Sequence, residues 1–533
     1  MHRTRTTVGL LLTALVVVSA VSFVGAGVQS PLAAADDGDD WSSDRADAGR
    51  TGATNDSGPA PHATEAWNTG FDARAEGGPA VANGTAYTVV TTDADLPATG
   101  QVLAYDTATG EKRWTSADVG AATGSPAVAN GTVYVATRGT DTDAYEDNGG
   151  LYALDAATGE VQWRTENAHR GDPFVADGVV YVANAAYDAA TGERLWYGTG
   201  TLAGVSDGTA YLHNGSTVWA HDAATGEVQW RARLPTSADT VDAEGAVTSD
   251  RVYLTVETAN ASHPVYALST DDGSVAWTHA VEASSDDVRA NLVSAPAVHD
   301  GSVYVSARGD TATVHALDAT TGDERWSYDT PADHLSAPTV GNDTVYLGGR
   351  YFSKLAEVGD TVAPATVAVY ALDATDGTER WNYSTGETSG LVAYAPVVDD
   401  GRAYVTVREW NGIYSDESRL YALGSSDAPP KRTRQVAPDK PEIPDVTIET
   451  EPADAGERTF RENRTVTLRA NASTAPDDEI RRYEWDVDGD GTYERTGQEI
   501  TVSTEVCGDR KVTVRVVDDD LLTATDSVTL TRT

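Results

Sequence analysis

The sequence predicts an all-β protein: an eight-bladed β-propeller closed by an N-terminal strand, followed by an immunoglobulin-like β-sandwich. Three observations support this prediction. A phrase of the type Ala-Leu-Asp-x-x-Thr-Gly-x-x-x-Trp recurs seven times, a second phrase upstream of it recurs eight times, and residues 445–533 alternate apolar and polar side chains. Repeats of this length are typical of propellers, in which each repeat contributes one four-stranded sheet.

Each repeat reads as four short antiparallel strands, as the copy at residues 124–163 illustrates. Asn130-Gly131 supplies two residues that tolerate positive φ in a tight hairpin. Asp155-x-x-Thr-Gly159 fits a turn with a positive-φ glycine. Apolar and β-branched residues between these turns predict the strands. The four predicted strands of this copy are Pro126–Val128, Val133–Ala136, Leu151–Leu154 and Val161–Trp163.

The closing tryptophan of the repeat is offset along the chain. The eighth upstream phrase runs to Leu423 without a tryptophan, whereas Trp67 stands immediately before the first upstream phrase. We therefore expect the strand around Trp67 to complete the last unit, which would leave no exposed edge strand. One large aromatic per unit is expected to pack against the neighbouring unit. The eight tryptophans are Trp67, Trp114, Trp163, Trp196, Trp230, Trp277, Trp326 and Trp381.

These residues resemble the pyrroloquinoline-quinone (PQQ) type propeller repeat. That family includes quinoprotein alcohol dehydrogenases and the bacterial lipoprotein propeller of outer-membrane protein assembly. The segment Trp41–Gly52 also resembles the lead-in before the first blade of such proteins, so the resemblance spans about residues 41–424. It implies the fold, because the repeat motif marks the packing of blades and not a cofactor.

The sequence divides the chain into four parts. Residues 1–35 are a predicted signal peptide, 36–424 the propeller, 425–444 a proline-rich linker and 445–533 the sandwich. In the last part, Tyr483-Glu-Trp-Asp before an Asp-Gly pair, and Val512-Thr-Val-Arg-Val-Val-Asp, resemble a polycystic-kidney-disease (PKD) domain. Such domains of secreted proteins act as spacers or adhesion modules.

The N-terminus predicts export. His2, Arg3 and Arg5 form a basic start, an apolar run follows from Val8 to Val24, and Ala33-Ala-Ala offers a small-residue cleavage site. The run is shorter than the ~20 residues of a membrane-spanning helix, and an uncleaved anchor is the alternative. The expected location is secreted or at the extracellular cell surface.

Composition excludes several classes of partner and site. The chain has 82 Asp and Glu against 38 Lys and Arg, a formal net charge of −44, so we expect no nucleic acid partner. The acidic surface resembles that of proteins from halophilic archaea, in which salt screens repulsion between carboxylates. Folding should then require high salt, and an unchanged circular dichroism spectrum and melting temperature after dialysis into dilute buffer would contradict this. The single cysteine, Cys507, excludes an intramolecular disulfide and a thiolate zinc site.

One acidic loop predicts a metal site. Asp486, Asp488 and Asp490 place carboxylates at alternate positions before a glycine, as a calcium loop does. The twelfth position is Gly497, where an EF-hand requires glutamate. The two interpretations are therefore a calcium site at these three residues and an acidic hairpin turn.

The lengths of the connections predict a ligand face. Turns one-to-two and three-to-four of each unit are short and lie on one face of the ring, whereas the other connections vary in length. Loops that vary on a rigid scaffold usually carry binding. The long ones hold aromatic residues outside the repeat pattern, which are ligand-face candidates or residues that pack these loops down: Tyr145, Tyr351, Phe352, Trp410 and Tyr414.

These observations favour an exported, non-enzymatic binding or scaffolding propeller at the cell surface. We expect a monomeric ring whose partner is a surface protein or polysaccharide and which meets a membrane only through an uncleaved N-terminal anchor. The alternative is a PQQ- and calcium-dependent quinoprotein-type oxidoreductase. PQQ is disfavoured because the vicinal cysteine pair common in family enzymes is missing and no residue matches their ligand motifs. The sequence identifies no catalytic and no cofactor-binding residue.

Overall fold

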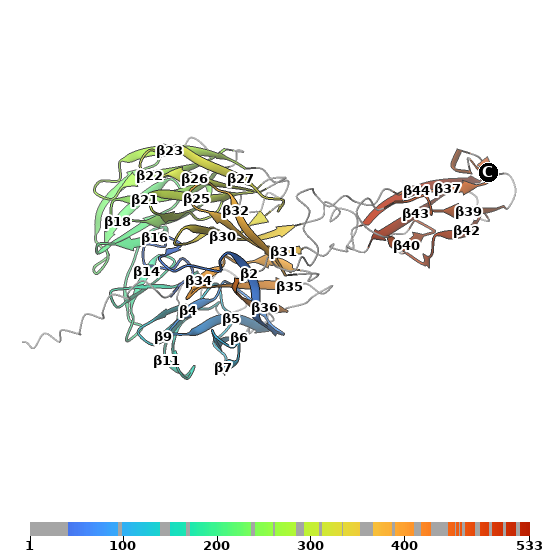
Figure 1. Ribbon diagram of the computed structural model, residues 1–533. Helices are drawn as coiled ribbons and strands as arrows, with labels where there is room; N and C mark the ends of the chain where they lie inside the picture. The colour runs from blue at the N-terminus through green and yellow to red at the C-terminus, as the bar shows by residue number, and fades with distance from the viewer. Residues whose placement is uncertain are drawn as a thin grey trace, which may run out of the picture. The chain divides into compact units, whose positions relative to one another are not determined.

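The structure, a computed structural model, describes most of the chain between Trp41 and Arg532 (Figure 1). Almost all regular structure there is β, with one 3-10 helix at Ala455–Glu457. No helix within these described residues has the length and apolar character that a membrane crossing needs. The residues outside the description are 1–40, 94–98, 139–149, 167–170, 236–239, 259–261, 284–292, 309–311, 333, 352–365, 386–389, 410–416, 428–445, 454, 458, 461–463, 475–479, 490–492, 505–507, 519–522 and 533.

Described residues up to Ser426 contain eight sheets, numbered here by the order of their repeats, in which every strand pair is antiparallel except that of β1 with β29. Sheet 1 contains β3 (Arg74–Ala75), β4 (Ala80–Ala82), β5 (Thr85–Asp93), β6 (Thr99–Asp106) and β7 (Lys112–Thr115). Sheet 2 contains β8 (Ala127–Ala129), β9 (Thr132–Ala136), β10 (Gly150–Asp155) and β11 (Val161–Glu166). Sheet 3 contains β12 (Phe174–Ala176), β13 (Val179–Val182), β14 (Ala185–Asp188) and β15 (Arg194–Tyr197). Sheet 4 contains β16 (Thr201–Ser206), β17 (Thr209–His213), β18 (Thr217–Asp222) and β19 (Val228–Arg233).

The remaining four sheets follow the same order, and the last two also take up N-terminal strands. Sheet 5 contains β20 (Thr240–Val247), β21 (Arg251–Thr258), β22 (Ser262–Ser269) and β23 (Val275–Glu282). Sheet 6 contains β24 (Ala297–His299), β25 (Ser302–Ala307), β26 (Thr313–Asp318) and β27 (Glu324–Asp329). Sheet 7 contains β28 (His334–Leu335), β29 (Thr339–Gly341), β30 (Thr344–Tyr351), β31 (Thr366–Asp373), β32 (Glu379–Ser384) and β1 (Ala53–Thr54). Sheet 8 contains β33 (Gly390–Ala393), β34 (Val397–Asp399), β35 (Arg402–Glu409), β36 (Ser418–Ser426) and β2 (His62–Phe71).

The turns have the chemistry that the repeat predicts. Asn130 and Gly131 both have positive φ, 50° and 74°, as a two-residue hairpin turn between β8 and β9 requires. In the turn after β10, the Asp155 carboxylate accepts hydrogen bonds from the backbone N–H groups of Ala157 and Thr158, at 3.0 and 2.9 Å. The aspartate and threonine of the repeat therefore stabilise the turn itself.

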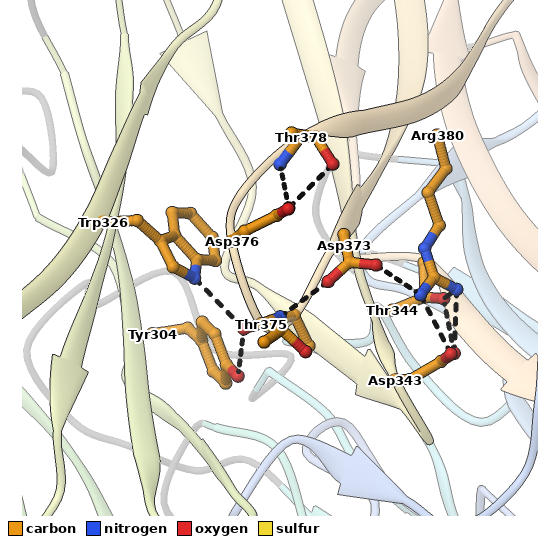
Figure 2. A network of polar contacts seen from close by, with 10 residues as sticks. Tyr304, Trp326, Asp343, Thr344, Asp373, Thr375, Asp376, Thr378 and Arg380 are labelled. Atoms are coloured by element: carbon orange, nitrogen blue, oxygen red, sulfur yellow. Dashed lines mark hydrogen bonds and ion pairs between the residues drawn. The ribbon is translucent and has the colours of Figure 1, made fainter.

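Neighbouring sheets are joined by the tryptophans. In Figure 2 the Trp326 indole N–H and the Tyr304 hydroxyl point to one acceptor, the carbonyl oxygen of Ala374 in the next sheet, at 3.0 and 3.1 Å. The same indole bond recurs at each repeat tryptophan. The eight bonds are Trp67 to Thr107, Trp114 to Ala156, Trp163 to Ala189, Trp196 to Ala223, Trp230 to Thr270, Trp277 to Ala319, Trp326 to Ala374 and Trp381 to Pro59.

The turn glycine of the repeat is required by this contact as well as by its backbone. Gly377 has φ of 74°, and a Cβ there would lie 2.5 Å from the Trp326 ring. Gly401, in the hairpin turn before β35, has the same φ and open space around the Cβ position.

Comparing two alanine substitutions separates these effects. Gly401→Ala should lose ~1–2 kcal/mol of unfolding free energy through backbone strain alone. Gly377→Ala should lose a further ~1–3 kcal/mol, because the added methyl must displace the indole. Denaturant unfolding measures both variants, and equal losses would show that the turn glycine is needed only for its φ.

The N-terminal residues line the inner edge of the sheets. We call residues 41–56 the inner segment. Its carbonyl groups accept hydrogen bonds of 2.7–2.8 Å from one valine N–H in the first strand of each of six sheets. The donors and acceptors are Val81 to Trp41, Val128 to Ser42, Val205 to Ala48, Val247 to Gly49, Val298 to Thr51 and Val340 to Gly52. Edge N–H groups that would otherwise face solvent are thereby paired, in sheets 1, 2, 4, 5, 6 and 7 in turn.

The next strand joins the two ends of the repeat region. Strand β2 pairs antiparallel with β36, with Trp67 opposite Ala422, in the place that the offset tryptophan predicts. The first strand of sheet 8, β34, contacts the first strand of sheet 1, β4. N-terminal residues therefore complete sheet 8. They also supply Trp67, which bonds to Thr107 of sheet 1, and Pro59, which accepts from Trp381 of sheet 7.

The C-terminal part has its own core. Trp485, fully buried, packs among apolar side chains of both of its sheets, including Val466 and Val514. One sheet contains β37 (Glu449–Glu451), β39 (Thr465–Arg469) and β42 (Glu499–Ser503). The other contains β38 (Thr459–Phe460), β40 (Ile480–Asp486), β41 (Arg495–Thr496), β43 (Gly508–Asp518) and β44 (Thr523–Arg532).

Candidate functional site

The inner segment occupies one end of the space between the first strands. Each valine that donates to it stands two residues before the hairpin turn of its strand, as Val128 does before Asn130. The inner segment therefore lies toward the short turns. The other end, which we call the mouth, is formed by residues three or four positions before these valines or their equivalents, and the Asp44 and Arg45 side chains of the inner segment reach it. The mouth residues are Ser125, Asp172, Glu244, Ser294, Ser336 and Tyr394.

Two carboxylates meet at the mouth on one serine. The Ser125 backbone N–H donates to Asp172 at 2.6 Å, and the Ser125 hydroxyl donates to Asp44 of the inner segment at 3.2 Å. A guanidinium nitrogen of Arg50 lies 3.6 Å from a carboxylate oxygen of Asp44, and the same guanidinium lies over the ring of Phe174. Burial and the Asp44 charge raise the pKa of Asp172 to about 7, against the opposing effect of Arg50. Asp172 thus gains or loses its proton near neutral pH.

A small cavity is lined by residues of sheets 5, 6 and 7. Its volume is about 140 Å³, and Glu244, Arg308, His334 and the hydroxyl groups of three serines line it with Ala295, Leu335 and Ala337. Burial and the charges of Arg350 and Arg308 lower the pKa of His334 to about 4, so the imidazole is neutral at pH 7. The serines also bond within the fold, as when Ser306 donates to the Ser336 carbonyl at 2.9 Å. This cavity offers one carboxylate and one guanidinium to a small polar ligand.

Most of the predicted ligand-face aromatics cannot be placed. Tyr145, Phe352, Trp410 and Tyr414 lie outside the described residues. Tyr351 ends β30, where its backbone is opposite Thr366. The loop aromatics therefore stay predictions, and the polar groups of the mouth are what the structure brings together.

The acidic loop of the C-terminal part gathers three carboxylates. Oxygens of Asp486, Asp488 and Glu494 lie within 4.8 Å of one another, and Asp490 lies outside the described residues. Asp486 accepts from the Gly489 N–H at 2.6 Å, and Glu494 accepts from the Val487 N–H at 3.0 Å. These bonds fit a hairpin turn as well as a metal site. Glu494 was missing from the sequence prediction, which considered only the alternating aspartates.

The mouth residues were missed too. A signal existed for Asp172, because Gly171-Asp-Pro replaces the Gly124-Ser-Pro of the preceding repeat. No comparable signal marks Asp44, since its proximity to Asp172 depends on the path of the inner segment.

Comparison with known proteins places the chain in a family. A family model described as "Outer membrane protein assembly factor BamB" matches residues 57–169, 98–213, 185–306 and 263–406, together more than half of the chain. The serine/threonine-protein kinase AfsK of Streptomyces coelicolor is 29% identical over 275 residues, 42% of this chain and 31% of AfsK. Tetrathionate hydrolase of Acidithiobacillus ferrooxidans is 24% identical over 300 residues, 52% of this chain and 57% of the hydrolase. The chain thus spans less than two thirds of either relative.

A solved structure shows the fold. The quinohemoprotein alcohol dehydrogenase of Comamonas testosteroni superimposes with a TM-score of 0.52 and 17% identity, over 76% of this chain and 83% of that one. At this identity the likeness concerns the propeller fold alone. The repeat tryptophans, the turn aspartates and the family match agree, and the chain belongs to the PQQ-like, BamB-type repeat family.

Proposed function

We propose that this chain is an exported binding or scaffolding propeller that takes up its ligand or partner at the mouth. The observation that carries the proposal is the group of charged side chains there, Asp44, Asp172, Glu244 and Arg308, which packing of the sheets does not require. The inner segment occupies the other end, where connections are short. Binding sites commonly lie where connections vary on a rigid scaffold.

The second candidate is a quinoprotein-type oxidoreductase. At the level of family the comparisons favour it over the first, because relatives with a named activity include quinohemoprotein alcohol dehydrogenases, one of them 28% identical over 177 residues. That match spans 23% of the enzyme, so its activity is not transferred to this chain.

The cavity at the mouth does not fit PQQ with calcium. The cavity of about 140 Å³ is smaller than the ~300–1,000 Å³ of typical cofactor pockets. Calcium takes six to eight oxygen ligands, roughly, and Glu244 is the one carboxylate among the residues that line the cavity. We therefore derive no redox step.

Cofactor uptake separates the two candidates. The folded full chain is mixed with PQQ and calcium, desalted, and measured for quinone absorbance. We expect no stoichiometric chromophore, and capture of a surface protein or polysaccharide from high-salt surface extracts. A stoichiometric chromophore would overturn the binding proposal in favour of the oxidoreductase.

Several features of this proposal extend the sequence predictions. We propose that the eight sheets are the blades of one closed ring, which the contact of β34 with β4 and the pairing of β2 in sheet 8 support, and that this ring is monomeric. Residues 1–35 are the signal peptide, residues 425–444 the linker and residues 445–533 a PKD-like spacer that holds the ring away from the surface. The acidic composition reflects a halophilic archaeal source.

Calcium binding by the C-terminal part has a direct test. If Asp486, Asp488 and Glu494 hold calcium, millimolar calcium should raise the melting temperature of this part by several degrees, because the ion binds only the folded state. Asp488→Asn/Glu494→Gln should abolish that rise, and Glu449→Gln, an exposed acid of the same part, should keep it. If calcium leaves the wild-type melting temperature unchanged, the loop is an acidic turn.

A further inference from the structure

We propose that the mouth recognises an acidic oligosaccharide through an arc of arginines. This inference rests on the proposed function and names the ligand class. A tyrosine in the second strand of every sheet packs on a repeat tryptophan, and in four sheets the residue four positions later is arginine. The pairs are Tyr134 and Arg138, Tyr304 and Arg308, Tyr346 and Arg350, and Tyr404 and Arg408.

The arc is continuous around part of the ring. Arg308, Arg350 and Arg408 belong to sheets 6, 7 and 8, and Arg138 to sheet 2. In sheet 1 the equivalent position is Thr91, and Arg74 stands directly opposite it across the pairing of β3 with β5. Sheets 6, 7, 8 and 2 therefore each place one arginine at the mouth end of the second strand, and sheet 1 places Arg74 on the strand opposite that position. Sheets 3, 4 and 5 have Ala185, Gly215 and Glu257 at this position.

The arginines meet in pairs where neighbouring sheets adjoin. His334 lies opposite Arg350 across the pairing of β28 with β30, and Arg308 lines the cavity that His334 also lines. Burial and the charge of Glu76 raise the pKa of Tyr394 to about 12, against the opposing charges of Arg408 and Arg74. The Tyr394 hydroxyl donates to the Ala75 carbonyl at 3.0 Å. Cations from successive sheets thus face shared spaces rather than open solvent.

Three of the five guanidinium groups, those of Arg138, Arg308 and Arg408, are the ones on which recognition would depend. All five arginines are half-buried. Arg74 pairs with Glu76 at 3.3 Å, whereas among the described residues no carboxylate pairs with Arg138, Arg308 or Arg408. The Nε atom of Arg408 is buried and has no hydrogen-bond partner among the described residues. A guanidinium presents a fork of donors that matches carboxylate and sulfate oxygens.

The charge pattern fits an elongated anion. The chain carries a net charge of −44, and against that background the mouth concentrates five arginines. Asp172 and Glu244, from sheets 3 and 5, belong to the same mouth, and Glu244 lines the cavity that Arg308 also lines, so an anion would be repelled where these two carboxylates lie. Because the arginines are spread over five sheets, one compact oxyanion cannot reach them all. A thin chain with regularly spaced carboxylates or sulfates can.

Calorimetric titration of the full chain tests the inference, at the lowest salt concentration that keeps it folded. The probes are an oligogalacturonate, a heparin-derived oligosaccharide, citrate as a compact polyanion and a neutral maltooligosaccharide. We expect one or both acidic oligosaccharides to bind, citrate to bind at least tenfold more weakly than they do, and the neutral sugar not to bind. The stronger acidic probe distinguishes carboxylate from sulfate recognition.

Matched variants locate the site. Arg308→Gln/Arg408→Gln should weaken binding at least tenfold. Arg113→Gln/Arg325→Gln removes two arginines that pair with turn aspartates on the short-turn side, and should change binding less than twofold. If the first variant fails to fold, Arg138→Gln alone should weaken binding at least threefold.

Three results would overturn the inference: binding of neither acidic oligosaccharide, equal binding of the neutral sugar, or equal affinity in the two double variants. Capture of a surface protein without oligosaccharide binding would overturn the arc and leave the proposed function standing. Stoichiometric PQQ uptake would overturn the proposed function itself.

Discussion

Deleting residues 36–71 should prevent the repeat region from forming a stable monomer. The deletion removes β2 from β36, the indole of Trp67 from its contact with sheet 1, and the acceptors of six valine N–H groups. Loss of the fully buried Trp41, which the deletion also removes, alone costs ~3–5 kcal/mol, and the whole stability of a domain is commonly ~5–15 kcal/mol. We expect aggregation in size-exclusion chromatography and rapid proteolysis near Leu420.

Two further variants sharpen this experiment. Deleting residues 445–533 should leave the melting transition of the repeat region unchanged, because its sheets contain no strand from that part. Replacing residues 41–56 with a glycine-serine stretch of equal length keeps β2, and separates the effect of the inner segment from that of the closing strand. A monomeric deletion variant with a wild-type melting temperature would refute closure by N-terminal residues.

The mouth should make stability fall as pH rises through neutrality. Burial and the Asp44 charge raise the pKa of Asp172 from 3.8 to about 7, so the folded state holds this proton more tightly than the unfolded state does. The stabilisation is fully present below about pH 4 and is lost as pH rises through 7. A shift of this size corresponds to up to about 4 kcal/mol of unfolding free energy.

Asp172→Asn should remove this dependence. Relative to wild type, the variant should gain stability between pH 5 and pH 8.5, by ~2–4 kcal/mol in denaturant unfolding. Asp207→Asn makes the same change of charge at an exposed turn aspartate, and its unfolding free energy should differ from that of wild type by a constant amount over this pH range. If the unfolding free energies of Asp172→Asn and wild type differ by the same amount at every pH, Asp172 is already ionised at pH 5.

The fold was largely predictable because its determinants are local and repeated. Asn130-Gly131 and Asp155-x-x-Thr-Gly159 set their turns through their own φ angles and side-chain bonds, and most of the other repeats have turns of the same kind. The position of the closing strand followed from one displaced residue, Trp67.

The site was not predictable in the same way. Asp44 and Asp172 both accept hydrogen bonds from Ser125, although Asp44 is 81 residues from Ser125 in the chain. No feature of the repeat predicts that proximity. The arginines recur at one position of the repeat, yet only the sheet order shows that five of them are neighbours. Long-range electrostatics depends on the assembled ring.

The inner segment has a consequence for how the protein folds. Its residues are synthesised first, yet Arg45 donates to a carbonyl 293 residues later, and Pro59 accepts from a tryptophan 322 residues later. Folding slows when stabilising contacts join distant parts of a chain, because loop-closure entropy is lost before they form. Arg45 and Pro59 must therefore wait unpaired until nearly the whole repeat region has emerged. We expect a slow late step, in which the earliest residues made are among the last to become protected from hydrogen exchange.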